Sequence, residues 1–246
     1  MKLEELARTH KTDKLQHGYL SVYDSLFSKF KDKEINFLEV GVYRGDSASL
    51  WEAYFSCANI FMSDIFDKTS ILSDYNVNFF KGDSGSAEDV TKLIEYAKEK
   101  SKKDTFDVII DDGSHFQYDQ MNGIGNLFPY VSDGGCYIIE DICKEERLRS
   151  GSMWWGHRGE SHHAVEGDCH AGSHLRTDKE WLAGDEIDYS ASTDATIKKF
   201  VETQVFCSKY LSEDKNTYIT NNTKTLKYYS DTNGLKCQSK LAVFEK

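Results

Sequence analysis

Two hydrophobic spacings alternate along the first 141 residues. Short apolar runs, typical of buried strands, occur at 36–40, 59–65, 76–83, 106–111 and 135–141. Helical spacing lies between them at 47–55, 86–100 and 117–131, and Ser86 and Asp89 suit the N-cap and first turn of helix 86–100. Strands that alternate with helices in this way predict βαβ units, and therefore a parallel sheet covered by helices on both faces.

The two ends of the chain depart from this alternation. Residues 1–31 predict amphipathic helical structure, with Tyr19, Tyr23 and Phe27 among the apolar positions. Residues 193–211 predict a further helix. The final predicted elements are two closing strands, plausible as a hairpin at the sheet edge, at 225–231 and 240–246.

No internal repeat or low-complexity linker divides the chain, so the sequence favours a single domain over 1–246. Within it, 1–34 would form a helical cover. Residues 144–190 lose all sustained period, which is typical of a lid or an insertion that shapes an acceptor site.

The composition of the chain argues against some classes of binding partner and location. The formal net charge is −11 with no block of Lys and Arg, which argues against nucleic acid because phosphate binding needs a basic face. No apolar run reaches the roughly 18 residues needed to span a membrane, and the N-terminus lacks the apolar core of a secretory signal. The six cysteines form no C-x-x-C pair. Together these features indicate reduced thiols in a cytoplasmic protein.

Acidic residues and glycines follow the first three predicted strands. The first strand leads into E-x-G-x-x-x-G, with Glu39, Gly41 and Gly45, rather than the G-x-G-x-x-G that holds a dinucleotide pyrophosphate. Asp64 ends the second strand, where a carboxylate can accept ribose hydroxyls, and Asp83 ends the third, where it can accept an adenine amino proton. An adenosine cofactor without phosphates and with a positive charge fits this set, although acids that merely cap helices would produce the same pattern.

A second group of acids, with one histidine, follows the fourth and fifth strands. FDVIIDDGSH supplies Asp111, Asp112 and His115, and CYIIED supplies Glu140 and Asp141. Adjacent strands lie about 4.8 Å apart, so carboxylates from two strand ends can surround one Mg²⁺ or Mn²⁺ ion. We predict Asp112, Glu140 and Asp141 as metal ligands.

Neighbouring residues on a strand point to opposite faces, so Asp111 is left to face the cofactor or to support the loop. A metal can align two acceptor hydroxyls and lower the pKa of the one that attacks. His115, near the metal and with an ordinary pKa close to neutral, can then deprotonate that hydroxyl. A core or capping histidine is the alternative reading.

These motifs resemble class I S-adenosylmethionine-dependent methyltransferases. LEVGVYRG, the strand end at Asp64, and KGDS carry the resemblance. It implies an α/β, Rossmann-like, doubly wound and mostly parallel seven-stranded sheet with an antiparallel C-terminal hairpin. It also implies that Glu39 and Gly41 lie near the methionine part of the cofactor, Asp64 at the ribose and Asp83 near the adenine.

The D-x-x-H step, the later E-D pair and HKTDKLQHGYLSVYDSLF (10–27) narrow the resemblance to metal-dependent sugar O-methyltransferases of macrolide antibiotic pathways, the mycinamicin and tylosin type. It implies metal ligands at Asp112, Glu140 and Asp141, a base at His115, and homo-oligomers in which the N-terminal segment helps to cover the site. The function implied is methylation of a small-molecule hydroxyl, on a sugar or a glycosylated natural product.

The segment 144–190 matches nothing in that family, so the acceptor is not identified. It contains a histidine-rich stretch, 157–174, whose spacing fits no zinc pattern, and a polar lid is favoured over a second metal site. Trp154, Trp155 and Trp181 could stack on a sugar or pack within the lid.

Two other function classes compete. A nicotinamide-dependent oxidoreductase would use a similar sheet, but the G-x-G-x-x-G motif is missing. A non-catalytic scaffold that binds an adenosine cofactor would not need a base beside a metal.

Overall fold

A computed structural model describes residues 2–10, 12, 14–142, 189–230 and 240–246. The histidine-rich stretch 157–174 lies outside the described residues, together with Trp154, Trp155 and Trp181. The same holds for the predicted insertion 144–190 apart from its last two residues.

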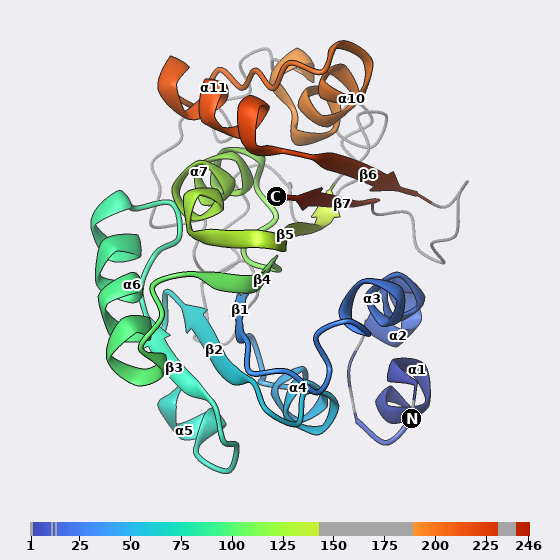
Figure 1. The fold of residues 1–246 in the computed structure, drawn as a ribbon, viewed down its shortest axis with the longest axis vertical. Helices are drawn as coiled ribbons and strands as arrows, with labels where there is room; N and C mark the ends of the chain where they lie inside the picture. Colours follow the sequence, from blue (N-terminus) through green and yellow to red (C-terminus); the bar gives the residue numbers. More distant parts are fainter. Residues whose placement is uncertain (1, 11, 13, 143–188, 231–239) are drawn as a thin grey trace, which may run out of the picture.

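The described residues contain a seven-stranded sheet with the strand order β3-β2-β1-β4-β5-β7-β6 (Figure 1). β1 to β5 pair in parallel, whereas β7 is antiparallel to both β5 and β6. The strands are β1 (Asn36–Val40), β2 (Asn59–Asp64), β3 (Asn78–Lys81), β4 (Phe106–Asp111), β5 (Val131–Ile142), β6 (Thr225–Tyr229) and β7 (Lys240–Glu245). The predicted α/β fold, with its mostly parallel sheet and C-terminal hairpin, is confirmed.

Helices pack on both faces of the sheet because β-strand side chains alternate in direction. On β1, for example, Phe37 packs into one apolar core and Leu38 into the other. The first core is covered by α1 (Leu3–Ala7), α2 (Lys14–His17), α3 (Tyr19–Phe27), α4 (Ala48–Tyr54) and α5 (Thr69–Leu72). The second is covered by α6 (Ala87–Ser101), α7 (Gln117–Leu127), α10 (Thr193–Thr203) and α11 (Glu213–Asn222). Short 3-10 helices lie at η1 (Phe128–Tyr130) and η3 (Tyr189–Ala191).

Helix boundaries differ from the prediction at both ends of the chain. The helical structure predicted over 1–31 is divided into α1, α2 and α3, and Gly18 separates the last two with a left-handed φ of 83°. The helix predicted over 193–211 ends at Thr203, because Gln204 adopts a left-handed φ of 57°. α11 then begins after Ser212, whose hydroxyl accepts the Lys215 N–H. In the part of the chain that the structure covers, no helix is both long and apolar enough to cross a membrane.

Candidate functional site

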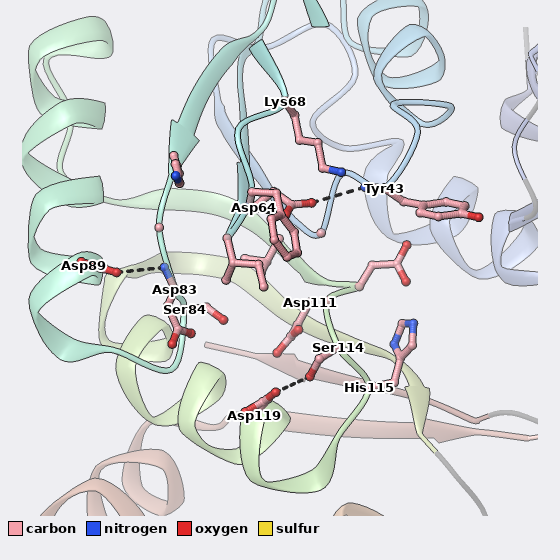
Figure 2. A pocket seen from close by; sticks show the side chains of 18 of the residues that line it. Tyr43, Asp64, Lys68, Asp83, Ser84, Asp89, Asp111, Ser114, His115 and Asp119 are labelled. Atoms are coloured by element: carbon pink, nitrogen blue, oxygen red, sulfur yellow. Dashed lines mark hydrogen bonds between the residues drawn. The ribbon is translucent and has the colours of Figure 1, made fainter. Parts of the chain in front are cut away.

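A cavity of about 390 Å³ lies at the carboxyl edge of the sheet, next to the point where the strand order reverses between β1 and β4 (Figure 2). Ligands of open parallel sheets bind at this position. The parallel strands bring six predicted site residues into its lining: Gly41, Asp64, Asp83, Asp111, Asp112 and His115.

Asp64, at the end of β2, joins two loops of the cavity. Its Oδ2 accepts the Val42 N–H at 3.0 Å, and its Oδ1 accepts the Phe66 N–H at 2.9 Å. A carboxylate has about four lone-pair positions, so these N–H groups orient Asp64 and leave it capacity to accept ligand hydroxyls.

Two glycines after β1 adopt left-handed backbone conformations and allow close packing. Gly41 has a φ of +95°, and a Cβ there would lie 2.0 Å from the carbonyl oxygen of Asp112. Gly45 has a φ of +77°, and a Cβ there would lie 2.9 Å from Ile71. Gly41 therefore lets the loop after β1 pack directly against the loop that carries Asp112.

Asp83, at the end of β3, is held by its own turn. Its Oδ1 accepts the Gly85 N–H at 2.8 Å, and its backbone N–H donates to Asp89 Oδ2 at 3.1 Å. Asp83 and Ser84 lie on the opposite side of the cavity from Tyr43 (Figure 2).

A buried lysine joins three acidic residues next to the cavity. The ammonium of Lys14 lies 2.5 Å from Asp112 Oδ2, 2.8 Å from Glu140 Oε1 and 3.1 Å from Glu39 Oε1. Lys14 and Glu140 are each 1% exposed, and Glu39 is fully buried. Tyr23 also donates its hydroxyl to Glu140, and the Trp51 indole donates to Glu39 at 2.9 Å. We call Lys14, Glu39, Asp112 and Glu140 the Lys14 cluster.

Burial and the close charges shift the pKa values of the residues in the Lys14 cluster. Burial alone would lower the pKa of Lys14, but the surrounding carboxylates outweigh it and hold that pKa well above its ordinary value. Burial raises the pKa of Asp112 to about 6, against the opposing effect of Lys14. Burial and the nearby Asp112 raise the pKa of Glu140. The ammonium is therefore the charge that stabilises this group of acids.

The neighbouring carboxylates Asp111 and Asp112 have different partners. Asp111 Oδ2 accepts the Tyr137 hydroxyl at 2.8 Å, and burial raises the pKa of Asp111 to about 7. A Cβ at Gly123 would lie 2.7 Å from the same oxygen, so α7 closely covers this carboxylate. Asp111 thus bonds to β5 while Asp112 bonds to Lys14.

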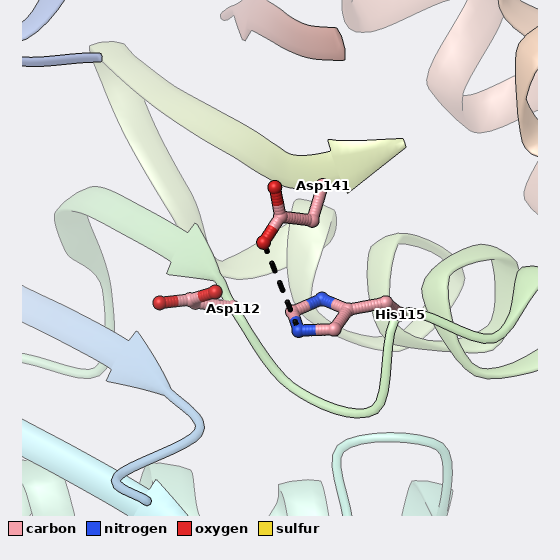
Figure 3. Close-up of side chains that lie close together, drawn as sticks. All are labelled: Asp112, His115 and Asp141. Carbon is pink, nitrogen blue, oxygen red and sulfur yellow. Dashed lines mark ion pairs between the residues drawn. The ribbon is translucent and has the colours of Figure 1, made fainter. Parts of the chain in front are cut away.

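Asp112, a member of the Lys14 cluster, also lies close to His115 and Asp141 (Figure 3). One potential ligand atom from each lies within 4.8 Å of the other two, and His115 Nε2 is 3.9 Å from Asp141 Oδ2. Tyr19 donates its hydroxyl to Asp141 Oδ1 at 2.6 Å. His115 and Asp141 have φ values of 60° and 51°, left-handed conformations that are rare outside glycine and recur at functional sites.

The electrostatics of Asp141 favour its charged form. Burial alone would raise the pKa of Asp141, but His115, His17 and the Tyr19 hydrogen bond lower it below its ordinary value. A charged carboxylate is the form that binds a divalent ion.

The arrangement of these three side chains fits a divalent ion. One potential ligand atom from each side chain lies within 4.8 Å of the other two, so Asp112 and Asp141 would hold a divalent ion with His115 beside it. Carboxylates suit Mg²⁺, and imidazole also suits Mn²⁺. Glu140, predicted as a further carboxylate ligand, accepts hydrogen bonds from Lys14 and Tyr23.

Three residues of this site, Lys14, Tyr19 and Tyr23, were not predicted as site residues. All three lie in the N-terminal segment predicted to cover the site, and they contact Glu140 and Asp141 at the end of β5. Their only signal was the segment 10–27 that carried the family resemblance, because nothing in the spacing of an N-terminal lysine shows which acids it meets.

The chain is similar in sequence to known O-methyltransferases that act on natural products. No model of a known protein family matches the chain. It is 30% identical over 149 residues to the mycinamicin VI 2''-O-methyltransferase of Micromonospora griseorubida, covering 57% of this chain and 36% of the relative. It is 34% identical over 149 residues to a tetracenomycin-C 3'-O-methyltransferase of Streptomyces olivaceus whose substrate carries a 2-methoxyrhamnosyl group, with the same two shares. The chain therefore spans about a third of the length of these curated relatives.

Solved structures show the same fold. The MycE methyltransferase of the mycinamycin biosynthetic pathway, in complex with Mg, SAH and mycinamycin VI, is similar with a TM-score of 0.65 and 23% identity. The match covers 100% of this chain and 54% of that one. The chain thus has the Rossmann-like fold of class I methyltransferases, and its resemblance to natural-product sugar O-methyltransferases is confirmed over 149 residues.

Proposed function

We propose that this chain transfers a methyl group from S-adenosylmethionine to a hydroxyl of a small molecule with the help of a divalent ion. The observation that carries the proposal is the convergence of Asp112, His115 and Asp141 at the edge of the cavity (Figure 3). The groups that would remove the proton and bind the ion thus lie beside the cavity proposed for the cofactor, in a chain with the fold of a methyltransferase.

The cavity fits the proposed cofactor in size and charge. Its volume of about 390 Å³ falls within the usual range for small-molecule sites. Asp64 would accept the ribose hydroxyls, and Asp83 would accept the adenine amino group. The acidic lining favours a cofactor whose sulfonium is positive.

The chain's own residues would then supply position and proton transfer. When bound, S-adenosylmethionine supplies an activated methyl group, and a divalent ion draws acceptor hydroxyls together and makes them more acidic. An imidazole nitrogen of His115 takes the hydroxyl proton as the oxygen gains the methyl group, the sulfur–methyl bond breaks and S-adenosylhomocysteine leaves. Asp141, 3.9 Å from His115 Nε2, stabilises the resulting imidazolium. A positioned base of this kind contributes about 10²–10⁴ in rate.

The acceptor is proposed to be a sugar hydroxyl. The names of both relatives give the methylated oxygen a primed position, 2'' or 3', on a natural product, and the second name includes a rhamnosyl group. We therefore propose a sugar or glycosylated natural product as the substrate class.

Methyl transfer from labelled S-adenosylmethionine to a panel of glycosylated small molecules tests this function. We expect turnover with Mg²⁺ or Mn²⁺ and none after EDTA treatment. Undiminished turnover in EDTA would contradict the role of the divalent ion.

His115→Asn tests the base while protecting the fold, because Asn tolerates the left-handed backbone of His115. We expect the variant to keep its melting temperature and its stabilisation by S-adenosylhomocysteine but to lose about 10²–10⁴ in rate. The matched control is His10→Asn, because His10 lies in the N-terminal segment and its ring is hydrogen-bonded to Ser49 of α4. If His115→Asn and His10→Asn transfer the methyl group at equal rates, His115 is not the base.

A further inference from the structure

Lys68 is a buried cation on the wall of the cavity. It follows β2 by four residues, is 2% exposed and lies among the lining residues. Its ammonium lies 5.8 Å from the centre of the Phe66 ring. Within the ranges that the structure describes, it has no hydrogen bond or ion pair from its side chain. A buried ammonium without an anionic partner is costly, so this position indicates that a ligand supplies one.

The acids around the cavity, by contrast, have partners within the protein. Asp64 accepts backbone N–H groups, Asp83 accepts from its own turn, and Asp111 accepts from Tyr137. Asp112 bonds Lys14. Lys81 is the other lysine in the lining, and its side chain is exposed. Lys68 is therefore the buried lysine of a lining whose other charged residues are mostly acidic.

The position of Lys68 indicates which part of the cofactor it would meet. Figure 2 shows its side chain reaching toward the loop of Tyr43, on the opposite side of the cavity from Asp83 and Ser84. If the adenine lies at Asp83, the amino-acid part extends toward the ends of β1 and β4, where Tyr43 and His115 lie. The one anionic group of S-adenosylmethionine, its α-carboxylate, belongs to that part.

We propose that Lys68 binds the α-carboxylate of the cofactor's amino-acid part and so selects S-adenosylmethionine over adenosine ligands that lack this group. The inference rests on the proposed function. A charge-assisted contact in a cavity shielded from water is both stronger and more selective than one at the surface.

Isothermal titration calorimetry with two ligands tests it. S-adenosylmethionine and decarboxylated S-adenosylmethionine differ only in the carboxylate. We expect Lys68→Met, which keeps the aliphatic stem, to weaken binding of S-adenosylmethionine by about 10- to 100-fold, as for loss of one charged hydrogen bond. Its affinity for the decarboxylated ligand should stay the same or rise, because a repelling charge is removed. Lys68→Arg should keep most of the preference for the carboxylate.

A control variant and two contrary outcomes complete this test. Lys81→Met removes the exposed lysine of the same lining and should leave the ratio of the two affinities unchanged. Equal weakening of both ligands by Lys68→Met, or no weakening of either, would overturn the carboxylate contact. A wild-type chain that binds neither ligand would instead overturn the proposed function, and this inference with it. Melting temperatures without ligand check that each variant is folded.

Discussion

Replacing Lys14 by Met should strongly destabilise the fold, because it removes the single ammonium of the Lys14 cluster and keeps the aliphatic stem. Lys14, Glu39 and Glu140 are at most 1% exposed, and Asp112 is 24% exposed at its side chain. After the substitution these carboxylates would share a site largely shielded from water with no lysine to balance them. Removing one partner of a buried ion pair costs about 3–5 kcal/mol.

That cost corresponds to a large shift in melting temperature. For a chain of this size, each kcal/mol lowers the melting temperature by about 2–4 °C, so we expect a decrease of roughly 6–20 °C. Thermal and urea unfolding, followed by circular dichroism, would measure it. The buffer should contain EDTA, so that no divalent ion replaces the missing ammonium.

Lys98→Met is the matched control for Lys14→Met. Lys98 forms an ion pair with Asp104 at 3.5 Å, but its side chain is 64% exposed and that of its partner 58%. Exposed pairs of this kind contribute about 0–1 kcal/mol. If Lys14→Met costs no more than Lys98→Met, the Lys14 cluster does not stabilise the fold and our account of it is wrong.

A second substitution separates electrostatics from packing. Glu140→Gln removes one of the charges that Lys14 balances while preserving the shape of the side chain. If the loss in Lys14→Met comes from unbalanced carboxylates, the double variant should be less destabilised than the sum of the two single variants. Strict additivity would instead assign the loss to packing of the lysine stem.

The remaining predictions concern a glycine beside the cavity and the buried carboxylate of Asp194. Gly41→Ala should destabilise the chain and weaken cofactor binding in calorimetry, because its Cβ would collide with the Asp112 carbonyl at 2.0 Å; full retention of both would contradict this packing. Asp194 joins α10 to Lys240 of β7 at 2.9 Å and to Tyr228 of β6. Burial opposes the charged form, but the hydrogen bonds of Tyr228 and Lys240 outweigh it and lower the pKa of Asp194. The contacts therefore stabilise the fold above about pH 4 and are lost as the pH falls through the lowered pKa. Asp194→Asn should reduce the melting temperature at pH 7, and a difference from the wild type that persisted undiminished in acid would contradict this assignment.

The local hydrophobic pattern predicted the central strands well because β1 and β4 are buried on both faces of the sheet. β1 has the predicted bounds 36–40, and α6 begins after the predicted N-cap, Ser86, whose side chain accepts the Asp89 N–H. α11 was missed because its ten residues are mostly polar and only Ile219 is buried. Its position depends on packing against α7 and η1, which no periodicity within the segment reveals.

The site residues likewise include some that the sequence could place and others that it could not. Parallel topology sends successive strand ends to one edge, so the amino-acid sequence alone was enough to place Asp64, Asp83 and Asp112 together. Lys14 and Lys68 could not be placed in this way, because a lysine's role depends on what lies at the end of a long flexible side chain rather than on strand order. Lys14 becomes part of the site only because the N-terminal segment packs over the end of β5 and places its ammonium among acids from three strands. The acids at the strand ends of this site were therefore predictable from topology, whereas the lysines near them follow from tertiary packing.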